Sequence, residues 1–229
     1  METHSYIEIR LPDGSRKSLF GQLVYEDIAQ ELWLQGVPGL TVFQGRAGLV
    51  SNGYFHTLDS EHAAGNPLIT IEISGTPEQV HQVYKYFDEH PLHRAQMVLI
   101  PEVYSARDIE WRRLPTYSAV KLKIYSKDDE VYHGVPVYHA IVRALQKRQI
   151  WWVTVQRAIE GFGCHHTFDE NEIFEFSDCT PIIIEALLPT AYGEEILREL
   201  RPILSHVSGP AIVMGCKWAT SDSKRDDSL

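Results

Sequence analysis

Two stretches of this chain share one pattern, TVFQGRAG at residues 41–48 and TVQRAIEG at residues 154–161. In both, a Thr-Val strand start is followed by polar and basic residues, and a glycine stands in the last place. An alignment without a gap sets Thr41 on Thr154 and Gly48 on Gly161. Amphipathic patterning alone would match apolar residues and leave these polar and glycine positions unmatched. The chain is therefore predicted to contain one structural unit twice.

Each copy predicts the same order of elements. An alternating strand comes first, IEIRL at 7–11 or VKLKIY at 120–125, and a helix with an apolar stripe follows. A second strand leads to a glycine-containing loop and a third strand, PLITIEI at 67–73 or PIIIEAL at 181–187. Aligning the two third strands in sequence requires one inserted residue in the second copy, and Thr76 then aligns with Thr190. A second helix and a last strand complete the order βαββαβ.

This order predicts an α+β fold of two tandem ferredoxin-like units, each an antiparallel sheet with helices on one face. The first unit is expected at 5–104, a polar linker at 105–118, the second unit at 119–218 and a disordered tail at 219–229. The other face of each sheet is expected to be apolar and uncovered by a helix. We therefore expect the chain to form a homo-oligomer, with a trimer favoured.

The second copy carries the residues of a recognisable family, which are LKIY at 122–125, Gly134, PVYHAIV at 136–142, IEGFG at 159–163 and the PIIIEAL strand. This pattern resembles the PII-like family called domain of unknown function 190, whose members resemble the nitrogen-regulatory PII proteins. The resemblance implies cytoplasmic trimers that bind effectors, often adenine nucleotides, in clefts between units. It also implies a loop, here 160–172, that contacts a partner protein. The glycine- and lysine-containing phosphate loop of true PII proteins has no clear counterpart, because AYGEE at 191–195 occupies that place.

Composition excludes several classes of protein. The net charge of −10 disfavours nucleic acid as a partner, because such binding needs Lys and Arg on phosphates. No apolar run reaches the roughly 18 residues of a membrane helix, so we expect no membrane insertion. The 3 cysteines lack CxxC spacing and no signal-peptide pattern opens the chain, which predicts a cytoplasmic location.

An anion site is predicted where the second strand meets the glycine loop. Arg157 would supply the cation, and the glycines after it would turn the backbone so that N–H groups face the anion. Lys123 could reach a phosphate if its side of the strand lines a cleft. The candidate ligand-binding residues are Arg157, Glu160, Gly161, Gly163 and Lys123, with Arg46 and Gly48 in the first copy. A solvent-facing arginine beside an ordinary turn is the alternative.

A metal site is the second hypothesis, because a thiolate and two imidazoles at Cys164, His165 and His166 suit Zn²⁺ or copper. Adjacent ligands on one loop rarely complete a tetrahedral site alone, so solvated side chains are the alternative. No nucleophile motif, P-loop or dinucleotide fingerprint is present, and no catalytic residue is predicted.

Together these patterns predict a PII-like, non-enzymatic regulatory protein. It would bind a small anionic ligand, with an adenine nucleotide as one candidate, and a partner protein through the 160–172 loop. A metal-binding protein of the same fold and a purely structural assembly module are the two alternatives.

Overall fold

The structure is a computed structural model. It describes residues 4–12, 23–37, 39–45, 47–49, 55–57, 68–91, 95–111, 114, 117–150, 152–162 and 181–217. The chain forms two compact units, of which unit 1 holds Val103–Gln156 and Ile183–Leu229. Unit 2 holds Glu2–Glu102 and Arg157–Ile182. Unit 2 therefore combines the first copy with a segment that the sequence places inside the second copy.

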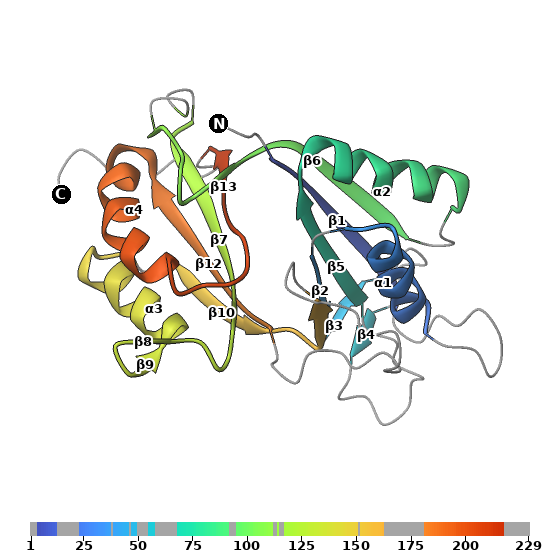
Figure 1. Cartoon of the computed structure of the whole chain (residues 1–229), viewed down its shortest axis with the longest axis horizontal. Coiled ribbons are helices and arrows are strands. Elements are labelled where there is room, and N and C mark those ends of the chain that lie inside the picture. Colours follow the sequence, from blue (N-terminus) through green and yellow to red (C-terminus); the bar gives the residue numbers. More distant parts are fainter. Residues whose placement is uncertain are drawn as a thin grey trace. The chain divides into compact units, whose positions relative to one another are not determined.

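Unit 2 follows the order βαββαβ with a hairpin inserted before its third main strand (Figure 1). Its elements are β1 (His4–Pro12), α1 (Val24–Leu34), β2 (Leu40–Gln44), β3 (Ala47–Leu49), β4 (Phe55–Thr57), β5 (Leu68–Gly75), α2 (Pro77–Glu89), β6 (Gln96–Ser105, up to Glu102 in this unit) and β11 (Glu160–Phe162). The strand order is β6-β1-β5-β2-β11. The copy's fourth strand thus lies beside its first, followed by its third and second, as in a ferredoxin-like unit.

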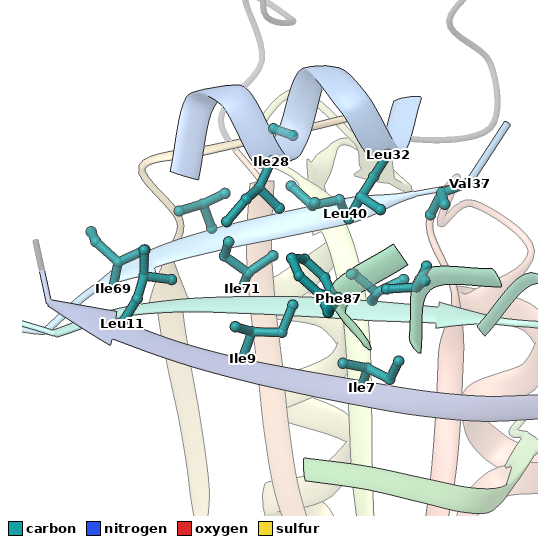
Figure 2. Close-up of a cluster of buried hydrophobic side chains, with 14 of the residues drawn as sticks. Ile7, Ile9, Leu11, Ile28, Leu32, Val37, Leu40, Ile69, Ile71 and Phe87 are labelled. Carbon is teal, nitrogen blue, oxygen red and sulfur yellow. The ribbon is translucent and has the colours of Figure 1, made fainter. Parts of the chain in front are cut away.

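The core of unit 2 explains why these residues form these elements. Ile7, Ile9 and Leu11 alternate along β1 and are buried against the helices, as period-2 spacing requires. Figure 2 shows their side chains and those of Ile69 and Ile71 pointing toward α1 and Phe87 of α2. The sheet face that carries Ile7 is therefore the face that α1 and α2 cover.

Helix α2 begins with a complete capping box. The backbone N–H of Gln79 donates to Thr76 Oγ1 at 3.3 Å, and the backbone N–H of Thr76 donates to Gln79 Oε1 at 2.9 Å. Pro77 follows Thr76 directly, at a position where a missing N–H costs little. This cap fixes where β5 ends and where α2 begins.

Unit 1 repeats the arrangement, with two helices on one face of its strands (Figure 1). Its elements are β7 (Ala119–Lys127), β8 (Val131–Tyr132), β9 (Val135–Pro136), α3 (Val137–Lys147), β10 (Val153–Arg157), β12 (Pro181–Pro189), α4 (Thr190–Leu204) and β13 (Ala211–Cys216). The strand order is β10-β12-β7-β13, again second, third, first and fourth. The predicted stripe of Val137, Ile141 and Leu145 is fully buried. The predicted fold class, two tandem ferredoxin-like units, is confirmed.

The inserted residue in the alignment of the third strands was wrong. Ile71 and Ile184 are both fully buried, and these two residues correspond in an alignment without a gap. The N-cap of α2 is Thr76 and that of α4 is Pro189, and these two positions also correspond without a gap. Matching Thr76 to Thr190 by identity had shifted the strand by one residue, which would turn its apolar side chains to the other face.

The segment predicted as a polar linker packs onto α4. Arg107 Nη2 donates to the carbonyls of Val207 and Gly209, both at 2.8 Å, beyond the end of that helix. Trp111 Nε1 donates to the carbonyl of Thr190 at 2.7 Å, and a Cβ at Gly193 would overlap the Trp111 ring. We call residues 105–111 the strap. The strap contacts both ends of α4: Trp111 bonds to the first residue of the helix, and Arg107 bonds to carbonyls just beyond its last residue.

The expectation of an apolar second sheet face is wrong for unit 2. Phe43 and the buried Tyr6 lie on this face, but most of its alternate strand positions are polar or charged, namely Glu8, Arg10, Thr41, Thr70, Glu72 and Ser74. In unit 1 the same face is mixed, with Lys121, Lys123 and Glu185 beside Ile183, Ile212 and Met214. The oligomer stays a prediction, but an uncovered apolar face no longer supports it.

Candidate functional site

The base of the predicted 160–172 loop is fixed on a strand of the first copy. β11 pairs antiparallel with β2 and sets Gly161 opposite Thr41. The N–H of Ile159 donates to the carbonyl of Val42 at 2.9 Å, which starts this ladder. The Thr and Gly that recur in the two sequence motifs thus meet across the copies: the glycine of the second motif faces the threonine of the first.

Gly161 is required by the close approach of β11 to β2. A Cβ at this position would lie 2.7 Å from the carbonyl oxygen of Leu40 and 3.2 Å from Cγ of Pro181. The N–H of Gly45 donates to the carbonyl of Leu68, so alternation turns the N–H and C=O of Thr41 toward β5. Thr41 and Gly161 are therefore a non-hydrogen-bonded pair, and the N–H of Gly161 points away from β2. This close approach gives Gly161 a role in strand packing, and the anion-facing amide predicted for it stays a prediction.

Arg157 is the last residue of β10, and its side chain is exposed. The next residue, Ala158, is buried, and its N–H donates to the carbonyl of Pro181 at 2.9 Å. The chain then passes through Ile159 into β11. A cation thus stands directly before the junction of β11 and β2, as the sequence predicted for this position.

Next to Gly161, unit 2 contains a row of polar side chains, Thr41, Glu72 and Glu8, that sequence reasoning did not single out. Gly161, Thr41, Glu72 and Glu8 are successive cross-strand partners on the face away from the helices. Thr41 and Glu72 are buried, and Glu8 accepts from Arg10 Nε at 2.6 Å. Two carboxylates directly opposite each other repel unless a cation or hydrogen bonds compensate them. Glutamates inside the otherwise alternating stretches IEIRL and TIEI are the sequence feature that marks this row.

Lys123 lies in unit 1, whereas Arg157, Glu160 and Gly161 lie in unit 2. Lys123 is buried, with Nζ 3.7 Å from Glu185 Oε2 and 5.9 Å from the centre of the Tyr125 ring. Lys121 Nζ lies 3.1 Å from the other oxygen of Glu185. The two lysines thus bracket one carboxylate on the sheet face of unit 1. This ion-pair arrangement gives Lys123 a structural partner.

Several predicted residues lie outside the described part of the chain, namely Arg46, Gly163, Cys164, His165 and His166. Gly48 lies in β3, opposite His56 of β4. Within the ranges given above, no group of three or more His, Cys, Asp or Glu side chains is arranged to hold a metal ion. Cys216 of β13 is a free thiol whose pKa is raised by burial and lowered in part by Lys121. Because burial is the larger effect, the pKa of Cys216 is raised overall, which disfavours the reactive thiolate form.

The family model described as DUF190, "Uncharacterized ACR", matches residues 11–104 and again residues 119–215. The chain belongs to this family. A UPF0166 protein of Aquifex aeolicus (strain VF5) is 25% identical over 80 residues, which span 35% of this chain and 76% of that protein. The regulatory subunit of aspartate kinase from Thermus flavus aligns over 89% of this chain and 94% of its own, with a TM-score of 0.36 and 10% identity. The two matched stretches agree with the internal repeat. Among the described helices of this DUF190 chain, none is long and apolar enough to cross a membrane.

Proposed function

We propose that this protein is a non-enzymatic, PII-like regulator that binds a small anionic ligand beside the junction of β11 and β2. Adenine nucleotides are the first candidates. The 160–172 loop would then carry the ligand state to a partner protein. This proposal rests on membership of the family and on one observation above all: β11, the base of that loop, pairs with a strand of the first copy.

That pairing gives a physical route from ligand to loop. A ligand that contacts Arg157 and the start of β11 would add contacts that exist only when the loop base is in place. Such differential contacts shift a two-state segment toward its ordered form. In this proposal the two states would therefore differ in whether β11 is paired with β2.

Ligand binding can be screened by thermal shift against ATP, ADP, AMP and cyclic nucleotides, since a ligand of the folded state raises the melting temperature. Calorimetry with the nucleotide that gives the largest shift would then measure its affinity for Arg157→Ala. Loss of a charge-assisted hydrogen bond costs about 1.5–3 kcal/mol. This corresponds to roughly ten- to a hundredfold in affinity. Arg143→Ala, which removes an exposed arginine of α3, is the matched control.

Unchanged affinity of Arg157→Ala would remove Arg157 from the proposal, and a thermal shift with no nucleotide would remove the nucleotide as ligand. A rise with Zn²⁺ or Cu²⁺ that His165→Ala abolishes would favour the metal-binding alternative instead. If neither nucleotides nor metal ions change the melting temperature, the purely structural assembly module would remain as the function.

A further inference from the structure

Strands β2 and β10 occupy the same place in their units but differ at their outer edge. Both are the second strand of a copy, and the gap-free alignment equates Val42 with Val155. β11 lies against the outer edge of β2. β10 ends the strand order of unit 1, and among the described strands only β12 is its neighbour.

The burial of the two strands follows this difference. Val42 is 0% exposed, whereas its counterpart Val155 is 43% exposed, and Trp152 just before β10 is 71% exposed. Thr154, the counterpart of the buried Thr41, is also exposed. Thr-Val is common to both strands, so the local sequence does not explain the contrast. The strand added at the edge of β2 is a structural difference that accompanies it.

The backbone of β10 is oriented to accept such a strand. The N–H of Leu187 donates to the carbonyl of Trp152 at 3.1 Å, and the N–H of Ala158 donates to the carbonyl of Pro181. Even-numbered residues of this segment therefore face β12, and alternation turns the N–H and C=O of Val155 outward. In β2 the equivalent carbonyl, that of Val42, accepts the N–H of Ile159 from β11. An exposed edge with outward backbone groups is a template for a further strand.

The structure also contains the strand that would fit. β3, Ala47–Leu49, is the counterpart of β11, Glu160–Phe162, in the same gap-free alignment. β3 pairs with β4, which is its only strand partner in the described part of the chain. Gly48 corresponds to Gly161, whose missing side chain is what permits β11 to approach β2.

We propose that β3 of a second copy of this chain adds to the β10 edge and sets its Gly48 opposite Thr154. The occupant is a second copy because Val155 stays exposed in the single chain, where β3 is paired with β4. Each chain then gives one strand and receives one. Such a head-to-tail contact closes into a ring or continues as a filament.

Two variants at one position test whether backbone pairing holds the chains together. Val155→Pro removes the outward N–H and leaves the groups that face β12 in place, whereas Val155→Ala keeps that N–H. We expect the wild type to sediment as a multi-chain particle at micromolar concentration. Val155→Pro should raise the dissociation constant by about tenfold or more, and Val155→Ala by much less. Far-ultraviolet circular dichroism checks that both variants are folded.

A cross-link identifies the strand that adds to the edge, even if Val155→Pro does not fold. In a background where all native cysteines are serine, chains with Ala47→Cys are mixed with chains that carry Val155→Cys. Paired antiparallel strands bring Cα atoms to about 4.5–5.5 Å, which suits a disulfide. A two-chain disulfide in the mixture, absent when either variant is mixed with the cysteine-free chain, supports the proposal. A monomeric wild type, equal effects of the two Val155 variants, or no mixed disulfide would each overturn it.

Discussion

Gly161→Ala tests whether β11 is held on β2 by close backbone approach. The added Cβ would lie 2.7 Å from the carbonyl oxygen of Leu40, 3.2 Å from Cγ of Pro181 and 3.4 Å from Cα of Thr41. Contacts below about 3 Å are not tolerated by real Cβ atoms, and the first of these atoms belongs to a backbone that cannot rotate away. The strands must therefore separate, or the ladder must distort.

The expected magnitude follows from two opposing effects. Overpacking of this kind costs about 1–3 kcal/mol. Replacing glycine by alanine also restricts the unfolded chain, which stabilises by about 0.4–1 kcal/mol. We therefore expect a net loss of about 1–2 kcal/mol in the free energy of unfolding of unit 2. The loss should be local at first, because β11 is short and lies at the end of the strand order.

Amide hydrogen exchange is the direct assay. The N–H of Ile159, which donates to Val42, should exchange faster in Gly161→Ala, while amides in the centre of β5 keep their protection. The double variant Gly161→Ala/Pro181→Ala separates the two contacts. If the Leu40 carbonyl is the dominant obstacle, removing the Pro181 ring should restore little of the lost stability.

Unchanged protection of Ile159 in Gly161→Ala, together with an unchanged urea midpoint, would refute the role assigned to Gly161. Full recovery in the double variant would show that the Pro181 ring, and not the approach of the two backbones, makes the glycine necessary.

Three further variants probe what holds each unit together. Ile71→Ala, in the fully buried core of unit 2, should cost about 2–5 kcal/mol in urea unfolding. Arg107→Ala should cost about 1.5–3 kcal/mol in unit 1, because the strap then leaves the carbonyls beyond α4 without their charged donor. Arg148→Met should lower stability near neutral pH. Its hydrogen bond holds the pKa of Glu199 below the ordinary value, so this stabilisation is present above the usual carboxyl range and lost as pH falls through the lowered pKa. Thermal melts of wild type and Arg148→Met at a series of pH values should converge in acid.

Matched controls make these three results interpretable. Leu34→Ala removes an apolar side chain of α1 that is 62% exposed and should change stability by no more than about 0.5 kcal/mol. Arg143→Ala removes an exposed arginine of α3 and should leave the strap unaffected. A cost for either control equal to that of its partner would show that the effects do not arise from the named contacts. Melting curves of wild type and Arg148→Met that stay parallel into acid would contradict the assignment to Glu199.

Local periodicity was enough to predict the units but not their connections. The stripe of Val137, Ile141 and Leu145 and the alternation of Ile7, Ile9 and Leu11 follow from the spacing that buries one face of a helix or strand. The pairing of β11 with β2 joins residues far apart in the chain, and no local pattern encodes such a pair. The strap was missed for a related reason. Its composition is polar, yet Ile109 is buried, because one apolar residue and the donors of Arg107 and Trp111 suffice to fix a short segment.

The two copies differ in the charged side chains on the sheet face away from the helices, so a site in one copy does not predict the same site in the other. In the gap-free alignment Arg10 corresponds to Lys123, and both are cations on the face away from the helices. Arg10 binds Glu8 on its own strand, whereas Lys123 lies near Glu185 on the neighbouring strand. The position of Glu8 is a lysine in unit 1, Lys121, and it also contacts Glu185. The first copy thus sets two carboxylates against one cation, and the second sets two cations against one carboxylate. An anion that contacts this face would therefore be repelled more strongly in unit 2 than in unit 1. We therefore expect an anion site of unit 2 to lie at the Arg157 end of β11, away from Glu72 and Glu8.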